Sequence, residues 1–145
     1  MIKPPPVAAA DHRFQIRVYF EDTDAGGIVY YANYLKYAER ARTELLRTMG
    51  FESSVCMANK GVGLAVRRCR ADFFRPAKLD DQLEVATRVL EVKGASVSLR
   101  QVIKRGGEEL VDMEIRLACM DANGKAARLP DGLGAALKGK RTGIY

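Results

Sequence analysis

Residues 21–33, which read EDTDAGGIVYYAN, concentrate the residue types in this chain that can do chemistry. Glu21, Asp22 and Asp24 supply carboxylates, and Gly26 and Gly27 follow at once. A carboxylate can attack a carbonyl group or take a proton from water. Glycines let the backbone turn tightly and adopt conformations that other residues avoid. The spacing therefore singles out Asp24, the carboxylate nearest the glycines, as a candidate for acid–base or nucleophilic chemistry.

The rest of the composition narrows the chemistry further. The only histidine, His12, lies beside a Pro-rich N-terminal stretch, so a Ser–His–Asp or Cys–His site would have to recruit that stretch. Cys56, Cys69 and Cys119 show no CxxC spacing, which argues against a disulfide framework and against a zinc site. Reduced thiols suit the cytoplasm. Acid–base work must therefore fall mainly to carboxylates.

A calcium loop is an alternative interpretation of the same stretch. Counted from Asp22, the acids at positions 1 and 3 and Gly27 at position 6 fit such a loop, but Gly26 at position 5 and Asn33 at position 12 do not. Neither GxGxxG nor GxxxxGK[ST] occurs in this stretch, so a phosphate-binding loop is weakly supported. We expect no metal site and no cofactor.

Two elements must position Asp24. Residues 13–20 (RFQIRVYF) alternate between apolar and polar, which predicts a half-buried strand. After the loop, apolar and small residues recur at steps of three and four and predict a helix over about 31–49, capped by Gly50. The stripe comprises Tyr34, Ala38, Ala41, Leu45 and Met49.

The start of this helix lies next to the loop and could take part in its chemistry. Backbone N–H groups of a first helical turn are unpaired and carry the positive end of the helix dipole, so those near Tyr31 would polarise a carbonyl oxygen. With Asp24 beside them, the arrangement suits hydrolysis of an activated acyl group. Residue chemistry alone leaves the alternative open that the three acids are only turn and helix-end charges.

The remainder of the chain predicts strands at 61–76, 82–92, 95–105 and 109–120, with a loop at 51–60. In the first of these, one face is expected to carry Ala65, Cys69, Ala71 and Phe73. The division expected is an arm at 1–11, one domain at 12–130 and a loose basic tail at 131–145. One helix covering one face of an antiparallel sheet gives an α+β fold. Uncovered edges and a second face favour an oligomer.

Charge indicates the class of partner. The 145-residue chain has a net charge of +6 and an isoelectric point near 9.4, which favours an anionic partner. Nucleic acid is disfavoured because aromatic base-stacking motifs are not interleaved with the basic residues. No stretch approaches the roughly 18 apolar residues of a membrane span, and no signal peptide is recognised.

The stretch RVYFEDTDAGGIVYYANYLKYAERARTELLR resembles the hotdog-fold acyl-CoA thioesterases, most closely the YbgC type and its relative 4-hydroxybenzoyl-CoA thioesterase. The likeness continues more weakly through VRRCRADFFRPAKLDDQLEV to about residue 120. It implies a hotdog fold, in which a five-stranded antiparallel sheet wraps the long helix. It also implies homodimers with active sites at the interface, and commonly homotetramers built from two dimers.

The resemblance also implies roles for individual residues. Asp24 matches the catalytic aspartate, as nucleophile or general base, and Tyr31 matches the position whose backbone N–H binds the thioester oxygen. YbgC-type members usually carry Tyr and His where this chain has Phe20 and Tyr31, which resemble the 4-hydroxybenzoyl branch instead. The substrate-binding candidates are Gly26, Gly27, Ile28, Val29, Tyr30, Arg67, Lys93, Gly94 and Ser96.

The leading hypothesis is therefore a cytoplasmic acyl-CoA thioesterase acting on short-chain or aryl acyl-CoA, with coenzyme A entering as part of the substrate. A non-catalytic hotdog protein that binds acyl-CoA or acyl-carrier protein is the alternative, motivated by the missing His and Tyr. Acyl-carrier protein is a further candidate partner of the enzyme itself.

Overall fold

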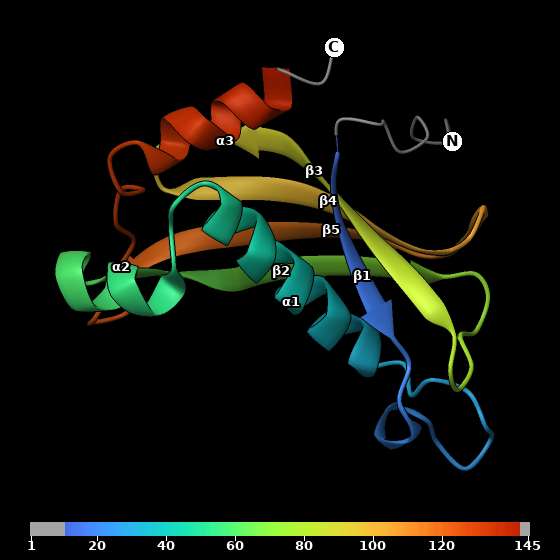
Figure 1. The fold of residues 1–145 in the computed structure, drawn as a ribbon. Helices are drawn as coiled ribbons and strands as arrows, with labels where there is room; N and C mark the ends of the chain where they lie inside the picture. The colour runs from blue at the N-terminus through green and yellow to red at the C-terminus, as the bar shows by residue number, and fades with distance from the viewer. Residues whose placement is uncertain (1–10, 143–145) are drawn as a thin grey trace.

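The computed structural model describes residues 11–142, with side chains as far as Lys140, and consists of a curved sheet crossed by one long helix (Figure 1). The elements in chain order are β1 (His12–Arg17), the short 3-10 helix η1 (Phe20–Asp22), α1 (Asn33–Thr48), α2 (Ser53–Lys60), β2 (Val62–Phe73), β3 (Gln82–Val92), β4 (Ser96–Arg105), β5 (Glu108–Asp121) and α3 (Leu133–Thr142). The predicted α+β class is confirmed. The arm predicted at 1–11 lies, except for Asp11, outside the described residues.

The sheet has the strand order β1-β3-β4-β5-β2, and all neighbouring strands are antiparallel. β1 and β2 are therefore the two edge strands. The five-stranded antiparallel sheet and the long helix agree with the predicted hotdog architecture.

A β-bulge in β2 changes which side chains share a face of this strand, so the predicted face is partly wrong. The register of β2 on β5 shifts between Val66 and Arg68, so Arg67 has no partner on β5. An extra residue reverses the alternation of side chains beyond it. Ala65, opposite Ala118, thus lies on the other face from Cys69, opposite Ile115. The prediction that Ala65 shares a face with Cys69, Ala71 and Phe73 is wrong for Ala65.

The inner side of the sheet is filled mainly by α1, which packs on β1, β3 and β4 (Figure 1). Its buried residues are Tyr34, Tyr37, Ala38, Ala41, Arg42 and Leu45. The predicted helical stripe is confirmed, and Tyr37 adds a large side chain to it. Each large apolar side chain buried in this way stabilises the fold by about 1.5–3 kcal/mol.

Two short helices were not expected. α2 occupies most of the loop predicted at 51–60 and ends at Gly61, whose φ of +65° is the left-handed conformation that glycine tolerates. α3 replaces most of the loose tail predicted at 131–145. Leu133 and Leu137, four residues apart, put one apolar stripe of α3 into the core. Both predictions failed because eight- and ten-residue helices give only a weak periodic signal.

β2 is the least covered strand of the sheet. None of its 12 residues is buried, although its neighbour β5 is buried at alternate positions. Val66 and Phe73 face the inner side, where α1 covers other strands, and they remain 51% and 47% exposed. An exposed apolar strip along a free edge is typical of a surface that another chain covers.

Candidate active site

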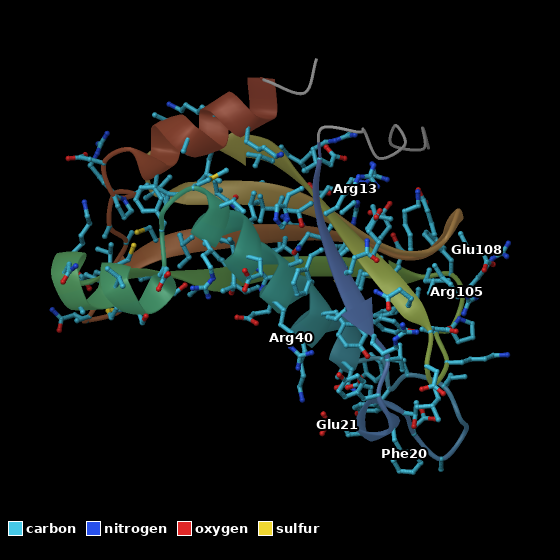
Figure 2. The ribbon with its side chains drawn as sticks, in the orientation of Figure 1. Arg13, Phe20, Glu21, Arg40, Arg105 and Glu108 are labelled. Atoms are coloured by element: carbon cyan, nitrogen blue, oxygen red, sulfur yellow. The ribbon has the colours of Figure 1, made fainter. Side chains whose placement is uncertain are left out.

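The loop between β1 and α1 extends beyond the end of the sheet, where the side chains of Phe20 and Glu21 project from η1 (Figure 2). Backbone hydrogen bonds fasten it to the segment that precedes β3. Val18 N donates to Asp81 O (2.9 Å), and Val29 N donates to Ala77 O (2.9 Å). The ends of the loop are thus held in place, while its middle, with Asp24, is exposed.

Asp24 heads a tight turn that the two glycines make possible. Its N–H donates to Ile28 O (2.9 Å), and Gly27 N donates to Asp24 O (3.0 Å). Gly27 has a φ of +80°, which strains any residue with a side chain. Gly26 N donates to the carboxylate oxygen Asp24 Oδ1 (2.8 Å), and a Cβ on Gly26 would lie 3.2 Å from that oxygen. The turn therefore fixes one carboxylate oxygen by a backbone N–H.

The start of α1 leaves backbone donors available at Tyr31 and Ala32, as the sequence predicted, but not at Tyr30, whose N–H donates to Asp22 O. α1 begins at Asn33, two residues later than expected, after a turn in which Asn33 N donates to Tyr30 O (2.8 Å). Within residues 11–142, the N–H groups of Tyr31 and Ala32 donate to no backbone oxygen. They point from the positive end of the helix dipole. A carbonyl oxygen placed there would be polarised.

Asn33 joins the loop to the helix. Its side-chain Nδ2 donates to Asp22 O (2.8 Å), and the same oxygen accepts a hydrogen bond from Tyr30 N (2.9 Å). The Asp22 carboxylate accepts a further hydrogen bond from Tyr19 N (2.9 Å). Asp22 is thus a structural residue of the loop. Asn33 fixes the distance between the Asp24 turn and the helix N-terminus.

Aromatic side chains form a wall beside this helix end. The ring of Tyr31 lies 5.2 Å from that of Tyr30 and 6.0 Å from that of Phe73, measured between centroids. Phe73 also contacts Tyr34, at 5.8 Å. Phe73 is the last residue of β2, and sequence patterning gave no reason to connect it with the loop. An aromatic wall of this kind suits an apolar acyl group more than a charged one.

Burial shifts the pKa of two tyrosines near the start of α1. Burial raises the pKa of Tyr34 and of Tyr37, so both phenols stay protonated at neutral pH. At the turn end of the sheet, burial likewise raises the pKa of the Cys119 thiol. No group of three or more His, Cys, Asp or Glu side chains that could hold a metal ion is found within residues 11–142.

The structure separates the predicted site residues into two groups. Gly26, Gly27, Ile28, Val29, Tyr30 and Tyr31 lie with Asp24 at one end of the sheet, which we call the loop end. Lys93, Gly94 and Ser96 form the β3–β4 turn at the other end, the turn end, where Lys93 N donates to Ser96 O (2.8 Å). β3 joins the two ends through 11 residues, about 35 Å at about 3.3 Å per residue. One chain therefore does not bring these groups together.

Arg67 belongs to the turn end. It lines a hollow of about 300 Å³ on the outer face of the sheet together with Ser96 and Arg116. A smaller apolar cavity of about 30 Å³ lies at the same end under α2, between Leu46, Cys56, Leu64 and Leu133. Asp24 lines neither of them. The described chain thus holds the Asp24 carboxylate on an open surface.

No helix in the described part of the chain is long and apolar enough to cross a membrane.

A long helix held against a five-stranded antiparallel sheet, with a carboxylate turn at the helix N-terminus, defines the hotdog class of acyl-processing folds. The chain belongs to the thioesterase-like superfamily, whose family model matches residues 18–137, and within it to the YbgC type.

The similarity to individual proteins covers most of the chain. An acyl-CoA thioesterase YbgC from Haemophilus influenzae is 44% identical over 108 residues, which are 74% of this chain and 79% of that protein. A probable thioesterase from Bartonella henselae is 38% identical, with a TM-score of 0.80 over 83% of this chain and 99% of that one. A gentisyl-coenzyme A thioesterase is 26% identical, with a TM-score of 0.78 over 83% of this chain and 98% of that one.

Proposed function

We propose that the protein hydrolyses acyl-CoA thioesters, with Asp24 as the reacting carboxylate and the backbone N–H of Tyr31 as the donor to the thioester oxygen. The observation that carries this proposal is the pairing of two features at the loop end. The carboxylate of Asp24 is held by Gly26 N, and the N–H groups of Tyr31 and Ala32 have no backbone acceptor within the described residues. One such donor stabilises a transition state by about 3–4 kcal/mol.

The same geometry serves two routes. In the first, the Asp24 carboxylate attacks the thioester carbon, the C–S bond breaks, and coenzyme A leaves as a thiolate that takes a proton from water. Water then hydrolyses the resulting anhydride and restores the carboxylate. In the second, Asp24 takes a proton from water as the oxygen of that water attacks the same carbon, and the proton passes to the departing thiolate. Neither route requires a cofactor.

The working unit we propose is a homodimer built through the free edge of β2. Its exposed inner strip, with Val66 and Phe73, would be covered by the same strip of a second copy. Two-fold pairing of edge strands is antiparallel, so it would bring the turn end of one protomer to the loop end of the other. Lys93, Gly94, Ser96 and Arg67 would then bind coenzyme A whose thioester reacts at the partner's loop end. Two dimers forming a tetramer, and a cytoplasmic location, belong to the same proposal.

For the acyl group we propose a short-chain or aryl residue. Ile28, Val29 and Tyr30 follow the Asp24 turn directly, and Tyr30 and Tyr31 continue into the wall that Phe73 completes. Phe20 and Tyr31 both supply aromatic surface in place of the hydroxyl and imidazole usual at these positions. A thioester of an acyl-carrier protein is a second candidate substrate, because it presents the same phosphopantetheine arm.

The test replaces Asp24 by Asn, which keeps the size of the side chain and removes its negative charge. We expect thiol release from a panel of short-chain and aryl acyl-CoA thioesters to fall by a hundredfold or more. Glu21→Gln is the matched control: it removes the same charge from the same loop, at an exposed side chain that projects from η1 (Figure 2), and should leave turnover unchanged. Equal turnover by Asp24→Asn and by the unmodified protein would remove Asp24 from the mechanism.

The alternative is a hotdog protein that binds acyl-CoA without hydrolysing it, favoured by the lack of His at Tyr31 and of Tyr at Phe20. It predicts saturable binding of acyl-CoA with no thiol release from any member of the panel.

A further inference from the structure

Tyr34, near the start of α1, connects this helix to the segment that precedes β3. Its ring is 3% exposed and packs against the rings of Tyr37 and Phe73, at centroid distances of 6.1 Å and 5.8 Å. Its hydroxyl oxygen accepts a hydrogen bond from the N–H of Ala77 (3.0 Å), and this bond is buried. A buried N–H that loses its acceptor destabilises the structure around it, so this contact holds Ala77 in place.

Ala77 extends this connection to the loop that carries Asp24. Its carbonyl oxygen accepts a hydrogen bond from the N–H of Val29 (2.9 Å), and both residues are buried. Ile28, the residue before Val29, accepts a hydrogen bond from the N–H of Asp24 (2.9 Å). A series of hydrogen bonds therefore runs from the Tyr34 hydroxyl to the backbone of Asp24.

The backbone of Tyr34 contacts the proposed oxyanion donor. Its N–H donates to Tyr31 O (3.2 Å) and so closes the turn that presents the N–H of Tyr31. Tyr34 is therefore connected to both parts of the proposed site. Its backbone contacts the residue that supplies the oxyanion donor, and its side chain reaches the carboxylate turn through Ala77.

Asn33, the neighbour of Tyr34, makes a comparable connection on the other side of Asp24. Asn33 donates to Asp22 O, which precedes Asp24 in the chain, whereas Tyr34 acts on Val29, which follows it. Asp24 itself is exposed, so packing in the core does not fix its position. The distance of Asp24 from the helix therefore depends on these two flanking connections.

We infer that Tyr34 is a positioning residue for thioester hydrolysis. Through Ala77, its hydroxyl keeps the Asp24 carboxylate at the distance from the helix N-terminus that the reaction requires. This inference rests on the proposed function. The carboxylate and the oxyanion donor act on the same carbonyl group, and an error of about 1 Å in such an alignment can lower the rate about a hundredfold. Tyr34 acts indirectly, since its hydroxyl is buried and bonded to Ala77, whereas Asp24 is exposed.

The test replaces Tyr34 by Phe, which keeps the buried ring and removes only the hydroxyl. We expect kcat for a hydrolysed acyl-CoA to fall about tenfold and KM to stay unchanged, because binding is retained while the reacting groups lose their alignment. Tyr37→Phe is the matched control from the same helix. Burial and the nearby Asp22 carboxylate raise the pKa of Tyr37, but its buried hydroxyl has no hydrogen-bond partner within residues 11–142, so kcat should not change.

Amide hydrogen exchange tests the connection without relying on activity. In Tyr34→Phe the N–H of Ala77 loses its acceptor, and the hydrogen bond from Val29 N to Ala77 O is no longer supported from α1. Exchange at both amides should therefore become about tenfold faster, while amides in the centre of β4 keep their rates. A loss of stability spread over the whole fold would instead accelerate all of these amides and would overturn a role confined to the loop.

The kinetic outcomes separate this inference from the proposed function. Thiol release from no thioester by the unmodified protein would reject the proposed hydrolysis, and the positioning role with it. Hydrolysis by the unmodified protein with an equal kcat in Tyr34→Phe would reject the positioning role alone. Equal losses of kcat in Tyr34→Phe and Tyr37→Phe would also overturn it, because the removal of either buried hydroxyl would then suffice.

Discussion

The loop end and the turn end of the sheet differ in how their charged side chains are held and paired. At the loop end, exposed Asp24 is held by backbone hydrogen bonds, and Arg105 nearby contacts the carboxylates of Asp81 and Glu108. At the turn end, Arg67, Arg68 and Arg116 form no ion pair with a carboxylate of the described residues. The first arrangement fixes the position of one carboxylate. The second leaves positive charge that an anionic ligand could neutralise.

This difference implies that each end supplies what the other lacks. A thioester needs a carboxylate and an oxyanion donor, whereas its nucleotide needs positive charge. The two ends lie about 35 Å apart along β3 in one chain. Antiparallel pairing of two β2 edges would bring the loop end of one chain to the turn end of the other. The strongest tests therefore break this pairing or combine differently substituted chains in one dimer.

The largest effect is expected from Val66→Glu. Val66 is half exposed in the single chain, so the substitution should cost its fold little, but it would bury an unpaired carboxylate in a β2–β2 interface. We expect light scattering to detect monomers and thiol release to fall about a hundredfold, because no complete site remains. Val66→Thr, which has nearly the same shape and no charge, should keep both dimer and activity. An active monomeric Val66→Glu protein would show that one chain suffices.

The next largest effect is expected when two differently substituted chains are combined in one dimer. If each site takes Asp24 from one protomer and Arg67 from the other, a heterodimer of Asp24→Asn and Arg67→Gln chains contains one unaltered site. Two tagged chains, co-expressed and purified as the heterodimer, should recover about half of the unmodified activity at low acyl-CoA concentration. Sites contained within one chain would give no such recovery, because each chain would carry its own defect.

Substitutions at the two glycines of the Asp24 turn should have smaller effects, and these effects should differ in kind. A methyl group at Gly26 would lie 3.2 Å from Asp24 Oδ1, so Gly26→Ala should displace the carboxylate and lower kcat about tenfold with little loss of stability. Gly27 has open space around it but a φ of +80°, so Gly27→Ala should instead destabilise the fold, by about 1 kcal/mol. Kinetics and urea unfolding of both variants measure the contrast. Identical effects on kcat would mean that the contact at Gly26 does not control Asp24.

The sequence made the loop end predictable because its determinants are local. The Asp24 turn depends on two adjacent glycines, and the helix start on a stripe that begins at Tyr34. The turn end depends on contacts that no local pattern reveals. The bulge at Arg67 decides which side chains of β2 meet Arg116, and it also reversed the expected face of Ala65. Phe73 reaches Tyr31 only because β2 ends beside α1.

The smallest effect concerns Arg105, which contacts the segment that holds the Asp24 loop. Arg105 donates to Pro76 O (3.1 Å) and Asp81 Oδ2 (2.7 Å), and so ties the β4–β5 turn to the segment that holds Val29. Partial burial would raise the pKa of Asp81, but hydrogen bonds from the Lys78 amide and Arg105 outweigh it and lower that pKa from 3.8. The stability that this pairing adds is therefore complete above pH 3.8 and is lost as pH falls through the lowered value.

Arg105→Gln should accordingly lower the free energy of unfolding by about 1 kcal/mol at pH 7, a modest value because both side chains are partly exposed. The difference from the unmodified protein should shrink below about pH 4. Urea unfolding at pH 7 and at successive lower values measures it, with Arg13→Gln as a control for an ion pair far from the loop. A difference that stays constant down to pH 3 would show that Arg105 acts through its bond to Pro76 O and packing, and that its pairing with Asp81 adds little. The loop end would then owe its rigidity to backbone contacts alone, which do not depend on pH.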